Sequence, residues 1–337
     1  MKVIRPITKN DLPALLKFAQ TAGMGVTSLP RHPTRLEEKL ERSLNSFQHS
    51  HTFGKGLYLF VLEDLSNGKL GGTSAIDAKT LGSQNGYYYR VEELVLPKSH
   101  LSTKKSTKIL HPIHKKSHVT EIGGLYLLPK YRAGGLGRLL SLSRFLFIAA
   151  FPQRFSTKII AEMRGRIGKN SHSPFWEAVG QHFLNVSYDQ LLVELANDPS
   201  FVPSVVPQFP IYVNLLPRTA QLAIGKIHKN TRAAINLLQH EGFQETGEVD
   251  IFDAGPTLAA LTSRIRTIAV SKSAKVRDLI HDSLPGPQLL LSNDRIDYRA
   301  GWGEIHEHNE EAVTITHEVA DALKLQVGDT IRYATPA

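Results

Sequence analysis

The sequence contains no cysteine among its 337 residues. That absence excludes disulfide bonds, thiolate metal sites and a covalent intermediate in which a cysteine carries an acyl group. Any group transfer in this protein must therefore pass directly between two bound substrates or use an oxygen nucleophile.

Long apolar runs are also missing. No stretch of about 18 apolar residues, the length that a membrane-spanning helix needs, occurs anywhere in the chain. The first residues, Met1–Pro6, have the pattern of a strand entering a turn, whereas a signal peptide has a longer apolar stretch. We therefore expect a cytoplasmic protein without a membrane partner.

Acidic residues are outnumbered by basic ones, 31 against 40, which gives a formal net charge of +9. Much of the excess lies in residues 98–118, which hold six lysines and four histidines but no acidic residue. Nucleic-acid binding is the rival function that this charge suggests, but the segment lacks the interleaved aromatic residues on which bases stack. We expect 98–118 to be an exposed, mobile loop, dispensable for the fold, which at most steers anionic ligands.

Three of these histidines, His111, His114 and His118, have a spacing that could be mistaken for metal ligands. Because the chain offers no cysteine and this segment no acidic residue, we expect no metal site.

Hydrophobic periodicity and turn signals predict a mixture of strands and helices. The predicted strands are Val3–Arg5, Leu57–Glu63, Leu70–Ile76, Tyr87–Leu96, Ile122–Leu128, Lys158–Met163 and Glu248–Phe252. The predicted helices are Leu12–Thr21, Thr34–Phe47, Leu136–Phe151 and Pro174–Phe183, with two more near 218–226 and 231–241.

The length fits two domains or slightly more. Four prolines between residues 198 and 210 indicate a linker, and a third region begins near residue 264. That region ends in the pattern of a short helix, a turn and a strand over Val319–Arg332. We therefore divide the chain into residues 1–197, 198–263 and 264–337.

The sharpest local motif is Arg132-Ala133-Gly134-Gly135-Leu136-Gly137, between a predicted strand and a strongly apolar helix. Glycines allow the backbone to approach a ligand closely, and the start of the helix presents unpaired amides and a positive dipole end. These features suit a pyrophosphate. The glycine spacing is not that of a dinucleotide-binding fold, and the Lys-Ser/Thr pair of a P-loop is absent.

This R-x-x-G-x-G motif after a central strand resembles the acyl-CoA loop of the GNAT superfamily. Within that superfamily, the chain resembles the arginine N-succinyltransferase family, over roughly residues 1–262 and more loosely beyond. The matching stretches, in chain order, are Gly25–Pro30, Tyr89–Val91, Ser143–Phe151, Ala161–Gly165, Ser173–Trp176, Pro210–Tyr212 and Asp250–Leu258.

The resemblance implies a mixed α/β (α+β) fold, with a GNAT-type sheet flanked by helices in residues 1–197. It further implies a second, partial GNAT-like unit in 198–263 and a small C-terminal region with β structure in 264–337. The implied activity is transfer of succinyl from succinyl-CoA to the α-amino group of L-arginine, in arginine catabolism. Succinyl-CoA would be a co-substrate, with no tightly bound cofactor.

The resemblance also implies site residues. His228 matches the catalytic histidine of the family, and a histidine can both accept the proton of the amine and protonate the departing thiolate. Leu125, on the strand before the glycine loop, matches a contact with succinyl-CoA. Arg132, Gly135 and Gly137 belong to the loop that holds the pyrophosphate.

Charged side chains must match the charges of the substrates. Arg90 and Arg164 are candidates for the succinyl carboxylate, and Glu92, Glu121 and Glu162 are candidates for a guanidinium group.

Three departures from the family pattern leave the acceptor open: Leu128 before Pro129, where an acidic residue is usual, the Lys/His-rich run 104–118, and the proline-rich run 197–208. Ornithine or a related amine is the alternative acceptor. Because the family assembles from paired, related subunits, a homo- or hetero-oligomer and a non-catalytic, regulatory subunit also remain open.

Overall fold

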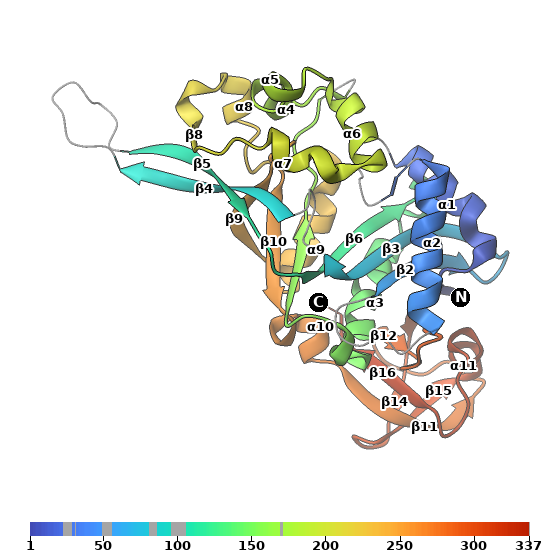
Figure 1. Ribbon diagram of the computed structural model, residues 1–337. Helices are drawn as coiled ribbons and strands as arrows, with labels where there is room; N and C mark the ends of the chain where they lie inside the picture. The colour runs from blue at the N-terminus through green and yellow to red at the C-terminus, as the bar shows by residue number, and fades with distance from the viewer. Residues whose placement is uncertain are drawn as a thin grey trace.

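The structure is a computed structural model that describes residues 1–22, 29–30, 32–48, 56–80, 86–95, 106–168 and 171–336 (Figure 1). Most of the stretch Gly25–Pro30, which carries part of the family resemblance, lies outside these residues. None of the helices in the described part is long and apolar enough to cross a membrane.

The strands are β1 (Lys2–Pro6), β2 (Leu57–Asp64), β3 (Lys69–Thr80), β4 (Tyr87–Val95), β5 (Ser106–His114), β6 (Val119–Leu127), β7 (Lys158–Glu162), β8 (Ile211–Tyr212), β9 (Gln244–Asp250), β10 (Pro256–Leu261), β11 (Lys272–Ile280), β12 (Leu289–Ser292), β13 (Ala300–Gly303), β14 (His306–Glu307), β15 (Ala312–Thr316) and β16 (Thr330–Ala334). The helices are α1 (Leu12–Thr21), α2 (Pro33–Gln48), α3 (Leu136–Ala150), α4 (Pro174–Ala178), α5 (Gln181–Leu184), α6 (Tyr188–Asn197), α7 (Val202–Val205), α8 (Arg218–Gln221), α9 (Arg232–His240), α10 (Arg266–Ala269) and α11 (His317–Leu323).

All described strands join one mixed sheet in the order β14-β15-β11-β16-β12-β13-β1-β2-β3-β6-β7-β10-β9-β4-β5-β8. The neighbours β6 and β7, near its centre, are parallel, while β3–β6 and β7–β10 are antiparallel. The mixed α/β class that the sequence predicted is confirmed. The boundary placed at residue 197 stays a prediction, and β4 from one side of it pairs with β9 from the other.

Helices cover both faces of the sheet because its central strands alternate their apolar side chains. On β2, Leu57, Leu59 and Val61 pack with α1 and α2. The intervening Tyr58, Phe60 and Leu62 pack with α3 on the opposite face. Successive strand residues point to opposite faces, so a strand that is apolar throughout must be covered twice.

Helix α3 is apolar on every side and is buried from Leu139 through Ile148. A helix of this kind needs protein on all sides. The C-terminal region provides part of that cover: Tyr298 donates a hydrogen bond of 2.7 Å from its hydroxyl to the Ser143 carbonyl, and β12, β13 and β16 contact the helix. Through β13, which pairs with β1, this region also extends the sheet.

A second core lies beneath the helices α4 to α8, which gather beside β4, β5 and β9 (Figure 1). Trp176 is fully buried there and donates a hydrogen bond of 2.9 Å from its indole nitrogen to the Val186 carbonyl. A Cβ on Gly180 would lie 2.0 Å from the ring of Trp176, so only glycine fits this position.

The prediction of a loop at residues 98–118 is wrong for residues 106–114, whereas residues 115–118 form no regular structure. Residues 106–114 form β5, which pairs with β4 over nine residue pairs and with β8 at its other edge. Thr107 is buried and Leu110 is fully buried, which stabilises the strand although Lys108, His111 and His114 are exposed. Residues 98–105 lie outside the described residues.

Other elements differ in extent. The helix predicted at 174–183 is broken at Val179, which has φ −129° and ψ −76°, so that α4 and α5 are separate. The predicted linker at 198–210 contains the short helix α7. The helix predicted near 218–226 ends at Gln221, and β10 and five of the six C-terminal strands were not predicted.

Candidate active site

The candidate active site is a cavity of about 570 Å³ that opens where β6 and β7 part. These two strands pair only at Thr120↔Ile159 and Glu121↔Ile160, although β6 continues to Leu127. The separated ends of both strands line the cavity together with α3 and α9. A bulge in the β3–β6 pairing at Gly124, whose φ is +60°, accompanies the separation. The predicted catalytic and succinyl-CoA-binding residues all line this cavity: Leu125, Arg132, Gly135, Gly137 and His228.

The glycine loop forms one end of the site. Gly134 and Gly135 have φ values of +61° and +71°, a conformation that glycine adopts without strain. Gly135 is the N-cap of α3, no side chain caps the helix, and its first turn has no acidic residue. Apart from Leu136, whose N–H donates to the Ala133 carbonyl at 3.3 Å, the amides at this end are therefore available to an anion. Arg132 is exposed and donates a hydrogen bond of 3.0 Å from Nε to the Leu127 carbonyl.

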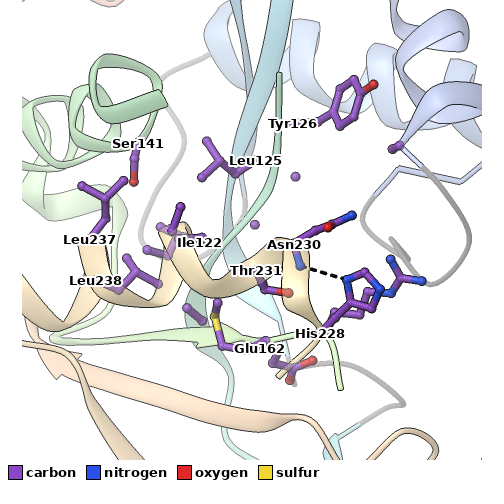
Figure 2. Close-up of a pocket in the computed structure, with 18 of the residues that line it drawn as sticks. Ile122, Leu125, Tyr126, Ser141, Glu162, His228, Asn230, Thr231, Leu237 and Leu238 are labelled. Atoms are coloured by element: carbon purple, nitrogen blue, oxygen red, sulfur yellow. Dashed lines mark hydrogen bonds between the residues drawn. The ribbon is translucent and has the colours of Figure 1, made fainter. Parts of the chain in front are cut away.

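Leu125 lies on β6 between this loop and the interior. Its side chain is half-buried and packs against the large central core, and Figure 2 shows it close to the middle of the cavity. The side chain thus has a packing role, while the backbone of β6 lines the cavity.

His228 forms the other end of the site (Figure 2). It is the N-cap of a short 3₁₀ turn, Lys229–Thr231, that leads into α9. The backbone N–H of Asn230 donates to Nδ1 of His228 at 3.2 Å. In the neutral ring the proton therefore lies on Nε2, which has no partner within the described part of the chain.

The environment of His228 favours the neutral ring. Partial burial lowers the pKa of His228, and the positive charges of Arg164 and Lys229 lower it further. The backbone of the histidine is fixed to the segment after β7 because its N–H donates to the Arg164 carbonyl at 2.9 Å. The site thus holds a neutral imidazole at a defined position.

A buried carboxyl group that the sequence did not indicate supports this end. Asp253 accepts hydrogen bonds from the amides of Gly165 at 2.8 Å and Gly255 at 2.7 Å. Burial, together with the charge of Asp250, raises the pKa of Asp253 to about 7. A Cβ on Gly165 would lie 2.2 Å from the Asp253 carbonyl oxygen, so glycine is required there. The carboxyl group joins β7 to the turn after β9 and so positions Arg164.

The candidates for substrate charges divide into two groups. Arg164, Glu121 and Glu162 line the cavity, and Tyr88 donates a hydrogen bond of 2.5 Å from its hydroxyl to Glu162. Arg90 and Glu92, on β4, lie outside it. Arg90 is 3.8 Å from Glu248, and Glu92 is 3.7 Å from His111.

Sequence reasoning missed Arg144 and Ser141, which line the cavity from α3. The available signal was an arginine at the centre of an otherwise apolar helix. Within the described residues, no cluster of three or more histidine, aspartate or glutamate side chains is placed to hold a metal ion.

Comparison with known proteins gives one family. The family model described as "Arginine N-succinyltransferase beta subunit" matches residues 2–267. The model of the C-terminal domain of the same subunit matches residues 272–335. The arginine N-succinyltransferase of Yersinia enterocolitica is 38% identical over 335 residues, which are 98% of this chain and 97% of that protein. The Salmonella schwarzengrund enzyme of the same name is 34% identical over 336 residues, with the same two shares.

A solved structure has the same fold. It is described as arginine/ornithine succinyltransferase subunit AI from Pseudomonas aeruginosa, and it superposes with a TM-score of 0.88 at 32% identity. The match covers 100% of this chain and 99% of that one.

Proposed function

The chain belongs to the arginine N-succinyltransferase family, and on that premise we propose that it transfers succinyl from succinyl-CoA to the α-amino group of L-arginine. The observation that carries the proposal is the single cavity, because it has an anion-binding helix start at one end and a neutral histidine at the other. In it both substrates can meet, as a direct transfer without an acyl-enzyme requires.

The glycine loop binds the pyrophosphate of coenzyme A through the amides at the start of α3, and β6 carries the rest of the cofactor arm towards Leu125. Binding both substrates in one cavity replaces an encounter in solution with a reaction between fixed partners. The amine nitrogen then forms a bond to the thioester carbonyl carbon, and collapse of the intermediate breaks the carbon–sulfur bond. One proton leaves the amine, and one reaches the thiolate.

His228 handles this proton. An imidazole whose own proton lies on Nδ1 can take up at Nε2 the proton that the amine releases and return it to the sulfur, so the ring is unchanged after each turnover. Nε2 is the atom that faces no protein partner, whereas Nδ1 accepts from the amide of Asn230. That contact positions the ring in the tautomer with the proton on Nε2, so the proton must move to Nδ1, and the contact must open, before Nε2 can act as the base.

The acceptor has a carboxylate, an α-amino group and a cationic side chain. Arg164, next to His228 in the cavity wall, is suited to the α-carboxylate, which would place the amine near the imidazole. Glu121 and Glu162, on neighbouring strands, provide negative charge for the guanidinium group. Ornithine offers the same three groups, and the printed name of the Pseudomonas relative includes it. It is therefore the second candidate acceptor.

Three more specific expectations remain proposals: a cytoplasmic location, no tightly bound cofactor, and assembly with copies of the chain or with a related subunit. Nucleic acid is not among the proposed partners.

A coenzyme A release assay on the purified single chain tests the function. Succinyl-, acetyl- and butyryl-CoA are each combined with arginine, ornithine and lysine. We expect the fastest release with succinyl-CoA and arginine. Faster turnover with ornithine would change the acceptor, and no release with any pair would favour a non-catalytic subunit.

A further inference from the structure

Arg144 is a buried cation without a charged partner. The side chain is on α3, two turns beyond the glycine loop, and the residue is only 2% exposed. Its guanidinium donates to the Ser141 carbonyl at 3.0 Å, to the Ser141 hydroxyl at 2.8 Å and to the Gly123 carbonyl at 3.4 Å. All of these acceptors are neutral, and no carboxylate in the described part of the chain forms an ion pair with it.

Two other buried or partly buried arginines of the molecule have compensating partners. Arg5 forms ion pairs with Asp11 at 2.7 Å and Glu63 at 2.6 Å. Arg154 lies over the rings of Tyr58 and Phe151, and cation–π contacts stabilise a guanidinium. Arg144 has neither kind of partner, and burial alone lowers its pKa to about 9. A buried charge of this kind costs folding free energy unless a counter-ion joins it.

The cavity determines where such a counter-ion could come from. Gly137, Ser141 and Arg144 are spaced by four and three residues, so they lie on one face of α3, and all three line the cavity. This face runs from the glycine loop inward over about 10 Å, at 1.5 Å per residue. It is the path that a coenzyme A arm bound at the loop would follow.

The guanidinium is also placed relative to β6. Leu125 is the expected contact with succinyl-CoA on β6, so we place the acyl carbonyl beside it, and Gly123, which accepts from Arg144, is two residues further from the loop along the same strand. A group that extends beyond the acyl carbonyl therefore approaches Arg144. In succinyl-CoA that group is the free carboxylate.

We propose that Arg144, with the hydroxyl of Ser141, binds the free carboxylate of the acyl donor and makes the site selective for dicarboxylic acyl-CoA thioesters. This inference rests on the proposed function and extends it, because it assigns the donor specificity to one side chain. Arg164, at the opposite end beside His228 and Asp253, then remains for the acceptor. No rearrangement of α3 is needed, since the charge already lies at the cavity wall.

The test compares binding of succinyl-CoA, butyryl-CoA and free coenzyme A by titration calorimetry. Butyryl-CoA has the same number of acyl carbons but no carboxylate. In the wild-type protein we expect succinyl-CoA to bind about 10- to 100-fold more tightly than butyryl-CoA, the range for a hydrogen bond to a charged group. In Arg144→Gln this preference should disappear, while the affinities for butyryl-CoA and free coenzyme A stay within about twofold.

Arg132→Gln is the matched control, because it removes the same charge from the loop end of the same cavity. It should weaken all three ligands by a similar factor and leave the preference intact. Arg144→Lys, which keeps a charge, should restore part of the preference. If the glutamine variant does not fold, Arg144→Met, which suits the apolar surroundings, carries the same measurement.

Melting temperatures separate this role from a structural one. Removal of an unpaired buried charge should leave the ligand-free variant as stable as the wild type or more stable. A folded Arg144 variant that keeps the wild-type preference for succinyl-CoA would overturn the inference, as would a wild-type protein that binds both thioesters equally. Failure of the wild type to bind free coenzyme A would instead refute the proposed function.

Discussion

The two ends of the cavity are built in different ways. The donor end uses one continuous stretch, β6, the glycine loop and α3, and recognises its ligand largely through backbone amides. The acceptor end draws its residues from three segments, with Glu162 and Arg164 on one, His228 on the second and Asp253 on the third, and backbone amides donate hydrogen bonds to Asp253 and His228. Changes at the donor end should therefore alter affinity, while changes at the acceptor end should alter turnover.

The strongest expected effect lies at the acceptor end. His228→Ala should lower kcat by about 10²–10⁴, the usual contribution of general acid–base catalysis, because no other group would transfer the proton. Affinity for succinyl-CoA by calorimetry should barely change, since the loop that holds the pyrophosphate is untouched. His240→Ala, an exposed histidine at the end of α9, is the control and should keep full activity. A kcat of His228→Ala within a factor of three of wild type would contradict the assignment.

The donor end should respond in the opposite sense. Gly137→Val should weaken succinyl-CoA binding by about tenfold or more, because a side chain at the first turn of α3 separates the amides from the phosphates. The fold should tolerate the change, since φ of Gly137 is ordinary and the nearest atom to a Cβ there is Leu127 Cδ1 at 3.4 Å. Gly134→Ala, where φ is +61°, should instead destabilise the protein by about 1 kcal/mol. Unchanged affinity in a folded Gly137→Val protein would show that the glycine loop does not bind succinyl-CoA.

The pH dependence of kcat/KM tests the acceptor end through a smaller expected effect. Because burial and Arg164 lower the pKa of His228, the acidic limb of kcat/KM should lie below the ordinary value of about 6.5. Activity is kept as the pH falls to 6.5 and is lost when the ring becomes protonated at lower pH. Lys229→Met removes one of the charges that lower this pKa, so the limb should move to higher pH. Lys226→Met, equally exposed, should leave it in place. A shift towards lower pH would exclude His228 as the titrating group.

The smallest effect concerns the exposed lysines of β5 and of the segment that follows it. Lys108→Gln combined with Lys116→Gln removes two exposed charges without touching Lys115, which pairs with Glu248. Stopped-flow association of succinyl-CoA should slow severalfold at low salt and be unchanged at physiological salt, where charges are screened over about 8 Å. An identical rate at low salt would show that the donor is attracted by the loop end alone.

The same contrast explains what could be predicted from the sequence. The donor end is local: Arg132–Gly137 and the apolar α3 are adjacent in the chain, so glycine pattern and periodicity indicate both. The bounds of α1 and α3 were predicted within one residue for the same reason.

The acceptor end depends on contacts between distant segments, such as Asp253 with Gly165, which no local pattern contains. Only the family resemblance singled out His228. Strand β5 was missed because its lysines and histidines do not give the apolar alternation of a strand. Its pairing with β4 over nine residue pairs cannot be seen in the local sequence.

The pairing of β1 with β13 has a consequence for synthesis. Val3 lies opposite Gly301, so one edge of β1 lacks its neighbour until about 300 residues have been made, which takes roughly 15–60 s at the usual rates of translation. During that time the nascent chain exposes an apolar strand edge, the feature through which incomplete proteins associate wrongly. The apolar surface of α3 likewise stays partly uncovered until Tyr298 has been made. The C-terminal segment thus completes the cover of α3. A chain that is released before this segment has been made keeps part of that helix uncovered.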